Sequence, residues 1–348
     1  MKVKLTAVGA EARGAWKQAL AVDSDALVSQ TPAWMDCVCG FGRYEDATRA
    51  YETEDGHQLV LPLARRRLPK PVTAVSSMPF GWGTGGLISS RGRASGEDVA
   101  AVVDDLAQER SILIVLRPSP MTDRVWGPVM PNEAIRIPYL SQSVDLTGGF
   151  SGAWKNFSSA AQRQCRKAER LGVTAERDDS GRLMPVFDAL YRTSVDRWAR
   201  QQHEPRWLAQ WRARRRDPSA KFEAVAERLA AACQVWIAWR AGEPLAGVVV
   251  LTNGHHATYW RGAMDKDAAR ATGATELLHQ HVIEEACNSG HLYYHLGDSS
   301  PSSGLARHKA RYGAKEYVYS AYRLERLPVT AVDRFVRRNA KKLIRFRD

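Results

Sequence analysis

The chain has 348 residues, enough for two compact domains with separate cores, and its 44% hydrophobic and 25% charged residues are typical of a soluble globular protein. Fifty basic residues against 38 acidic ones give a net charge of +12, which favours a polyanionic partner. No apolar run reaches the length of a membrane span, and the first residues lack the apolar segment of a secretory signal. We therefore expect a cytoplasmic protein without stable membrane insertion.

The cysteine pattern favours neither a metal site nor a disulfide framework. The five cysteines are odd in number, and Cys37 and Cys39 are too close together for a CxxC motif. No histidine lies at metal-ligand spacing from them, so we expect buried structural thiols and no bound metal.

The first 142 residues are predicted to alternate between short helices and strands. The expected elements are a strand at 3–7, helices at 12–20 and from Thr31-Pro32, strands at 48–52, 58–64 and 72–76, a helix at 97–110 and a strand at 111–117. Residues 119–142 contain several prolines and are expected to be irregular. A second unit is expected to begin with a strand at Ser143.

Residues 79–87 form a loop that contains four glycines. An ordinary glycine-rich loop is the simplest interpretation. The alternative is a ligand site, because glycines let the backbone approach a ligand closely and two aromatic side chains supply walls. The residues that would line such a site are Phe80, Gly81, Trp82 and Gly83.

Residues 158–171 predict a helix that begins at Ser158 or Ser159 and ends before Gly172. Its basic residues recur at i, i+3, i+4 and i+7 and so share one face; they are Arg163, Arg166, Lys167 and Arg170. A solvated face is the usual role of such a stripe. No carboxylate precedes Glu169, however, so these like charges repel one another, and a polyanion would relieve the repulsion.

Residues 184–216 combine tryptophans with arginines. A helix at 184–200 is followed by Trp207 and Trp211, and then by Arg212, Arg214, Arg215 and Arg216. Aromatic rings beside arginines suit single-stranded nucleic acid, which needs a stacking surface next to a phosphate counter-charge. A helix with buried tryptophans and exposed arginines explains the pattern equally well.

Residues 222–324 indicate a site for a phosphate-bearing or acyl-bearing ligand. The expected elements are a helix at 222–232, strands at 235–240, 245–251 and 259–264, a small-residue turn at 273–275, a helix at 277–287, a strand at 291–296, a Gly/Ser/Pro loop at 297–304 and a last strand at 316–324. A glycine turn onto a helix N-terminus, followed by a loop with several cations, provides amide donors and positive charge for such a ligand. Hydrolase motifs such as Gly-x-Ser-x-Gly and His-Glu-x-x-His, and the Walker lysine loop, are absent from the sequence.

This region resembles the Fem-type aminoacyltransferases, which belong to the Gcn5-related N-acetyltransferase (GNAT) superfamily. The resemblance is carried by Gly304-Leu305-Ala306-Arg307-His308-Lys309-Ala310-Arg311-Tyr312-Gly313, by the basic helix that ends in Lys167-Ala168 and Gly172-Val173, and by the loop at 79–87. His308 replaces an aromatic residue of the family pattern, and His295 replaces an acidic one. The run from Arg270 to Thr275 is similar to a GNAT pyrophosphate loop, with Thr275 where Gly or Ala is usual.

The resemblance implies an α/β (α+β) fold of two GNAT-like domains, with mixed, mostly antiparallel sheets flanked by helices and no coiled-coil arm. The first domain would comprise residues 1–142 and 317–348, and the second residues 143–316. Lys309 would stabilise the oxyanion or the terminal adenosine of the donor, although an isolated lysine is more commonly a surface residue. Asp298, His295 and His308 are candidate proton acceptors by residue type, and each type is more often structural.

The remaining site residues are assigned to the acceptor and the tRNA that such an enzyme would bind. The acceptor would contact the loop residues Phe80 to Gly83 together with Tyr259 and Arg261. The tRNA would contact the cations of the basic helix together with Arg212, Arg214, Arg215, Arg311, Lys315, Arg337, Arg338 and Lys341. The last three belong to an amphipathic tail, which could equally lie on an anionic membrane or pack on the first domain.

The sequence therefore predicts a monomeric enzyme that transfers an aminoacyl group from charged tRNA to the amine of a small-molecule or peptide acceptor. The product would belong to antibiotic biosynthesis or to peptidoglycan-precursor modification, and no cofactor would be needed. The first alternative is an acyl-CoA-dependent N-acyltransferase, and the second is a non-catalytic RNA- or membrane-binding protein.

Overall fold

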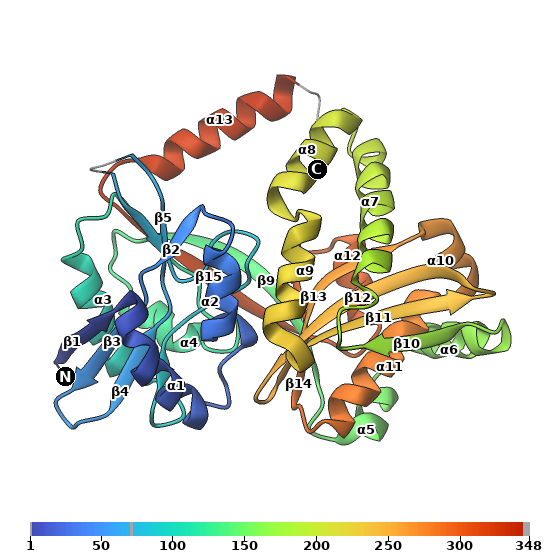
Figure 1. Cartoon of the computed structure of the whole chain (residues 1–348), viewed down its shortest axis with the longest axis horizontal. Coiled ribbons are helices and arrows are strands. Elements are labelled where there is room, and N and C mark those ends of the chain that lie inside the picture. Colours follow the sequence, from blue (N-terminus) through green and yellow to red (C-terminus); the bar gives the residue numbers. More distant parts are fainter. Residues whose placement is uncertain (1, 70–71, 344–348) are drawn as a thin grey trace.

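The computed structural model describes residues 2–69 and 72–343, without the side chains of residues 337, 338 and 340–343 (Figure 1). The first half of the chain contains β1 (Val3–Val8), η1 (Gly9–Ala12), α1 (Arg13–Val22), η2 (Val28–Gln30), α2 (Pro32–Cys39), β2 (Tyr44–Asp46), β3 (Arg49–Thr53), β4 (Gln58–Leu61), β5 (Ala64–Arg66), β6 (Ala74–Ser76), β7 (Ile88–Ser89), α3 (Gly96–Ala107), β8 (Leu113–Leu116), α4 (Asp123–Trp126), η3 (Gly127–Val129) and β9 (Ile135–Asp145).

The second half begins with helices and ends on a long strand and a separate helix. Its elements are α5 (Gly149–Lys155), α6 (Ser159–Arg170), β10 (Thr174–Asp178), α7 (Met184–Gln201), α8 (Arg206–Arg216), α9 (Ser219–Leu229), η4 (Ala230–Ala232), β11 (Cys233–Arg240), β12 (Glu243–Asn253), β13 (His256–Met264), α10 (Lys266–Thr272), α11 (Ala274–Asn288), β14 (Tyr293–Ser299), α12 (Gly304–Ala310), β15 (Lys315–Glu325) and α13 (Val329–Leu343).

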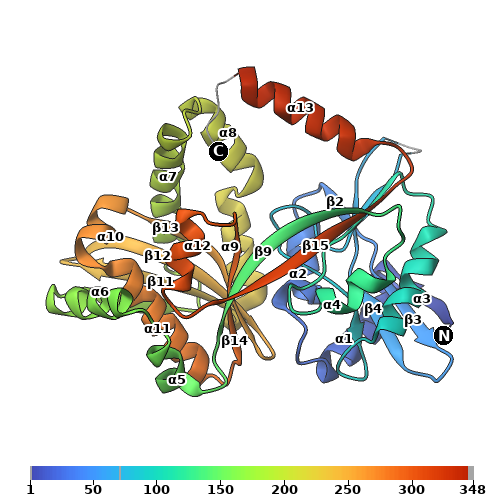
Figure 2. The same ribbon diagram turned by 180° about the vertical axis from the view of Figure 1, so that it is seen from behind.

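One mixed sheet runs through both halves, in the order β10-β11-β12-β13-β14-β9-β15-β8-β6-β5-β2, and a smaller sheet in the first half has the order β1-β3-β4-β7. Most neighbouring strands are antiparallel; β13 with β14 and β6 with β8 are parallel. The long strands β9 and β15 pair from Lys315 opposite Ser143 to Arg323 opposite Ile135 and join the halves (Figure 2). This architecture confirms the predicted α/β fold class.

The predicted domain boundaries fall within these shared strands. The position 142 lies inside β9, and the position 317 lies inside β15, whose last residues pair with β8 of the first half. The division into 1–142 plus 317–348 and 143–316 therefore remains a prediction.

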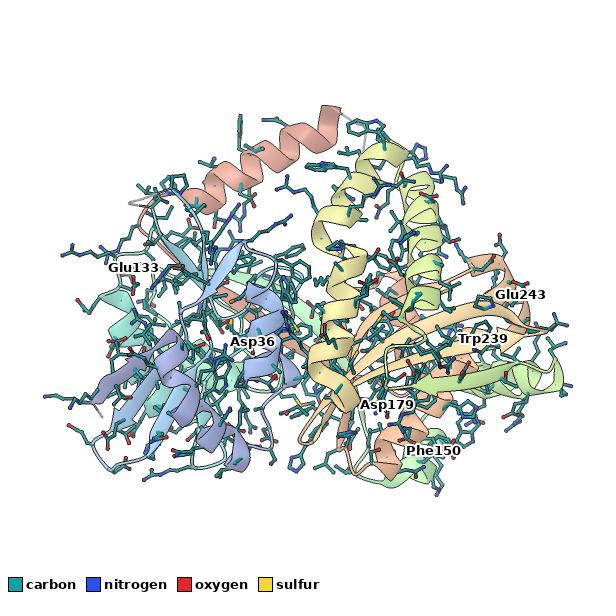
Figure 3. The ribbon with its side chains drawn as sticks, viewed as in Figure 1. Asp36, Glu133, Phe150, Asp179, Trp239 and Glu243 are labelled. Carbon is teal, nitrogen blue, oxygen red and sulfur yellow. The ribbon has the colours of Figure 1, made fainter. Side chains whose placement is uncertain are left out.

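Helices cover both faces of the sheet in the second half. Helices α7 and α9 pack on one face, and α5, α6 and α11 cover the other (Figures 1 and 2). The α9 face also meets the first half. Asp36 of α2 lies on the side of the first half that faces the second (Figure 3). Its carbonyl accepts a hydrogen bond from Arg228 of α9 at 2.9 Å, and Trp34 of α2 lies edge-on to Trp260 of β13, with ring centroids 5.5 Å apart. The two halves therefore share a hydrophobic core.

Two predicted helix starts are confirmed by their capping contacts. The Thr31 hydroxyl accepts a hydrogen bond from the Trp34 amide at 3.3 Å. Pro32, the residue after Thr31, occupies the first helical turn. The Ser158 hydroxyl accepts from the Ala161 amide at 3.2 Å and caps α6.

Two local predictions are wrong. Residues 119–142 are not irregular throughout, because β9 begins at Ile135. The pairing of β9 with β14 ends at Leu140, so Pro138 lies where this edge of β9 has no partner strand and needs no backbone donor. The turn expected at 273–275 is also shorter, because α10 runs to Thr272 and α11 begins at Ala274. Only Gly273 separates these helices, with a left-handed φ of +78°.

No helix in the described ranges is long and apolar enough to cross a membrane. Within the same ranges, no group of three or more His, Cys, Asp or Glu residues is placed to hold a metal ion. All five cysteines are free thiols.

Candidate functional site

Strands β13 and β14 separate after a short parallel contact. They pair only from His256 opposite Tyr293 to Thr258 opposite His295, and beyond that the two strands diverge. A register break between His295 and Gly297 in β14 accompanies the divergence. The gap exposes backbone groups that other parts of the chain can contact.

Lys309 of α12 is held at this break in β14. Its ammonium group donates hydrogen bonds to the carbonyls of Gly297 at 2.8 Å and Asp298 at 2.7 Å, and the residue is only 4% exposed. Burial lowers the pKa of Lys309 to about 8, against an opposing effect of Asp298. These contacts use two of the three N–H groups of the ammonium.

The Asp298 side chain is bound by groups from two other strands. The Tyr319 hydroxyl of β15 lies 3.0 Å from Oδ1, and the Arg117 guanidinium, next to β8, pairs with Oδ2. Arg117 also donates to Tyr319 at 2.9 Å and lies 4.6 Å from the centre of the Tyr139 ring. Asp298 is therefore a hydrogen-bonded counter-ion where the two halves meet.

Of the predicted histidines, His295 is buried and His308 is half-buried, and burial favours the neutral form of both rings. His308 Nε2 lies 3.0 Å from the Tyr312 hydroxyl, and burial lowers the pKa of His308. His295 Nε2 lies 2.8 Å from Nδ1 of His256, and burial lowers the pKa of His295 to about 3. Lys309, His308 and Asp298 are thus neighbours on α12 and β14, whereas His295 belongs to a separate histidine pair.

Side chains of the second half of the chain donate hydrogen bonds to the glycine loop. The Gly81 carbonyl accepts hydrogen bonds from Arg261 at 2.9 Å and Lys221 at 3.4 Å, and the Lys221 ammonium lies 3.9 Å from the centre of the Trp82 ring. Trp82 is buried, whereas Phe80 is 77% exposed beside it. Gly83 has a φ of +95° and packs against Ser29. The structure brings this loop and Arg261 together through the Gly81 carbonyl, and their role in binding an acceptor stays a prediction.

Tyr259 lies on the opposite face of the sheet from Arg261. A bulge at Trp260 in β13 breaks the alternation, so that Tyr259 packs 5.6 Å from His279 of α11 while Arg261 faces the glycine loop. The predicted acceptor-binding set is therefore divided between two faces.

The predicted tRNA-binding cations lie on several surfaces. On α6, Arg163, Arg166 and Arg170 are exposed, Lys167 is half-buried, and none of the four forms an ion pair with a described carboxylate. The carbonyl of the exposed Arg311 accepts from the Ser158 amide, which places Arg311 at the start of α6. The other cations are elsewhere: Arg212, Arg214 and Arg215 on α8 of the opposite face, and Lys315 paired with Asp145 at 3.0 Å. The side chains of Arg337, Arg338 and Lys341 lie outside the described residues.

A cavity of about 230 Å³, here called the junction cavity, lies between the first half and the sheet of the second half. Its polar and aromatic lining includes Asp23, Asp25, Arg124, His256, Tyr293 and Tyr317. None of these residues belongs to a motif, and more than two hundred positions separate Asp23 from His256 in the sequence. Only the tertiary structure brings them together.

Asp23 in this cavity is expected to make stability depend on pH. Burial raises the pKa of Asp23 to about 6, although the Ser89 amide and Arg93 favour its ionised form and Asp25 opposes it. The folded state therefore binds this proton more tightly than the unfolded state, and wild-type stability should fall as pH rises from about 4 to 6. Asp23→Asn should raise the free energy of unfolding at pH 7 by about 1–2 kcal/mol and give no gain at pH 4, measured by urea denaturation. An equal gain at both pH values would contradict this explanation.

Comparison with known proteins begins with the second half of the chain. Residues 155–317 match the family model described as an acetyltransferase (GNAT) domain. The matched segment, 163 of the 348 residues, contains the diverging β13 and β14, Lys309 and the basic helix α6. The GNAT match supports an acyltransferase. No curated protein matches the chain by sequence at a significant level.

Solved structures extend the similarity beyond the GNAT domain. The crystal structure of FemX is similar over 92% of this chain and 97% of its own, with a TM-score of 0.63 and 12% identity. The C-terminal domain (DUF2156) of a putative lysylphosphatidylglycerol synthetase from Agrobacterium fabrum covers 88% and 92%, with a TM-score of 0.51 and 14% identity. L-PGS from Bacillus licheniformis covers 91% and 94%, with a TM-score of 0.51 and 12% identity. At these identities the likeness shows the fold alone: the whole chain shares the fold of these structures.

Acetyl-CoA is the cofactor that a GNAT fold implies, and the residues at the start of α11 fit its pyrophosphate poorly. A Cβ atom at Gly273 would lie 2.5 Å from the carbonyl oxygen of Gln164, so α6 closes over the turn. The Glu276 carboxylate occupies the first turn of α11, with a side chain only 12% exposed, and would repel a phosphate there.

The gap between β13 and β14 is also filled on the α11 face. The His279 ring is tilted against the Tyr312 ring, with centroids 4.8 Å apart, and its Nδ1 atom lies 3.1 Å from the Tyr294 hydroxyl. The Tyr259 hydroxyl covers Gly262 so closely that a Cβ atom there would lie 1.9 Å from it. These rings occupy space that an inserted pantetheine arm would require.

Proposed function

We propose that the protein transfers an aminoacyl group from charged tRNA to the amine of a small-molecule or peptide acceptor. The observation that carries the proposal is the contrast at the start of α11. The turn fits a coenzyme pyrophosphate poorly, yet α6, which covers it, presents exposed cations that have no carboxylate partner in the described part of the chain. A polyanion that binds across the surface, rather than a coenzyme inserted into the sheet, suits this distribution of charge.

The chemistry needs a neutral amine, a positioned ester and a donor for the oxyanion. The amine nitrogen would attack the ester carbonyl, a C–N bond would form, and the C–O bond to the tRNA ribose would break. The amine proton would pass to the departing ribose oxygen. Lys309 would supply its third N–H group where β13 and β14 diverge, and Asp298 beside it is held by Arg117 and Tyr319. Antibiotic biosynthesis and peptidoglycan-precursor modification are the two settings that suit such a product.

Charge reversal on α6 tests the donor. The triple variant Arg163→Glu/Arg166→Glu/Arg170→Glu should weaken binding of aminoacyl-tRNA at least tenfold and reduce the slope of log affinity against log salt by about 2–3 units. Filter binding over a salt series measures both effects. Lys4→Glu/Lys17→Glu/Arg110→Glu, with the same change of net charge on exposed residues of the first half, is the matched control. If both triple variants weaken tRNA binding equally, α6 is not the tRNA-binding surface.

The GNAT match itself favours a second candidate, an acyl-CoA-dependent N-acyltransferase. Separate assays with a pool of charged tRNAs and with CoA thioesters discriminate the two. Turnover that RNase abolishes supports the tRNA-dependent reaction, whereas turnover with a CoA thioester in the presence of RNase supports the alternative.

A further inference from the structure

The junction cavity contains a polar atom that the chain itself does not satisfy. His256 is only 3% exposed and lines the cavity, yet its Nε2 atom has no hydrogen-bond partner among the described residues, and the Asp25 carboxylate is 4.0 Å away from it. Its Nδ1 atom is engaged with His295 at 2.8 Å. In the tautomer whose Nδ1–H donates to His295, Nε2 is a free acceptor. A buried polar atom without a partner marks a place for a ligand or an ordered water.

Charged groups of both signs line the same cavity. Asp23 is 5% exposed and accepts hydrogen bonds from the Ser89 amide at 3.1 Å and the Asp25 amide at 3.2 Å, and no described cation pairs with it. Asp25, by contrast, pairs with Arg93. Arg124 lines the cavity, is exposed, and forms no ion pair with a described carboxylate. The cavity thus offers an unpaired anion inside and an unpaired cation at its mouth.

We propose that the junction cavity binds the amine-bearing end of the acceptor, a small aminocarboxylate whose ammonium group contacts Asp23 and His256 Nε2 and whose carboxylate reaches Arg124. That the ligand is the acceptor rests on the proposed function, whereas the existence of the binding site does not depend on it. The volume of about 230 Å³ is below that of most ligand pockets and suits a small molecule or one end of a larger one. Burial raises the pKa of Asp23 to about 6, which an ammonium group would reverse.

The position of the cavity fits an acceptor. Its lining residues Ser119 and Tyr317 are each two positions from Arg117 and Tyr319, the residues that hold Asp298. The amine bound there would therefore lie in the same part of the cleft as Asp298 and the break in β14.

Calorimetric titration of the full chain with three probes tests the site. The probes are 4-aminobutyrate, butylamine and butyrate, which present both groups, the amine alone and the carboxylate alone. We expect 4-aminobutyrate to bind best and butyrate at least tenfold more weakly. Asp23→Asn should weaken 4-aminobutyrate and butylamine at least tenfold, and Arg124→Gln should weaken 4-aminobutyrate but not butylamine. Glu52→Gln, an exposed carboxylate of the first half, is the control.

The outcomes separate this site from the proposed function, because the titration contains no tRNA. Butyrate that binds as well as 4-aminobutyrate, or amine binding that survives Asp23→Asn, would overturn the site whether or not aminoacyl transfer occurs. Amine binding through Asp23 without transfer from any charged tRNA would leave the site in place and refute the proposed function. A melting curve checks that the Asp23→Asn variant folds. If it does not fold, the Arg124→Gln variant, changed at an exposed residue, still tests the contact with the carboxylate of the ligand.

Discussion

Lys309→Gln is expected to slow aminoacyl transfer by about 100- to 1,000-fold, the loss that follows removal of one preorganised donor from a developing oxyanion. Glutamine can still donate to one of the two carbonyls, Gly297 or Asp298, that now receive the ammonium group. It carries no charge, however, and leaves no N–H group positioned for the reacting ester. Single-turnover kinetics with charged tRNA should therefore show a reduced rate constant and a nearly unchanged affinity for tRNA.

The matched control is Lys17→Gln on α1. Lys17 is exposed in the first half and belongs to no predicted site, so its loss should change the rate less than threefold. Melting curves of both variants separate a catalytic effect from unfolding, because the buried Lys309 also contributes hydrogen bonds to β14. A wild-type rate constant in the Lys309→Gln variant would show that Lys309 takes no part in the reaction.

The fold was predictable because its signals are local. The Thr31-Pro32 start of α2 and the Ser158 start of α6 each depend on a few consecutive residues. The error at β9 has the same origin. Pro138 argues against a strand only when both strand edges are paired, and the sequence does not reveal that β14 stops pairing at Leu140.

The candidate site was predictable only where a motif spans it. The run from Gly304 to Gly313 places Lys309 beside β14, but the bulge that turns Tyr259 away from Arg261 depends on how β12 pairs with β13. The junction cavity has no local sequence signal, because Asp23 and His256, which both line it, are more than two hundred positions apart in the sequence.

Asp217→Asn is expected to cost about 3–5 kcal/mol of unfolding free energy, the loss that follows when a buried ion pair keeps only one kind of charge. The Asp217 side chain is fully buried and binds Lys221 at 2.9 Å and Arg261 at 2.8 Å. Arg216 also contacts it at 2.9 Å. These cations hold the pKa of Asp217 well below its usual range, whereas burial lowers the pKa of Lys221 to about 8. Without the carboxylate, three cations would face one another next to the Gly81 carbonyl.

Urea denaturation at pH 7 measures the loss, with Glu176→Gln as the control. Glu176 pairs with Arg182 at the surface, so its substitution should cost less than about 1 kcal/mol. The double variant Asp217→Leu/Lys221→Met should recover part of the stability lost in Asp217→Asn, because it removes a buried cation together with its counter-ion. If Asp217→Asn and Glu176→Gln cost the same, Asp217 does not hold the glycine loop against β13. The loop would then depend on the packing of Trp82 against Trp34, whose ring centroids are 5.4 Å apart.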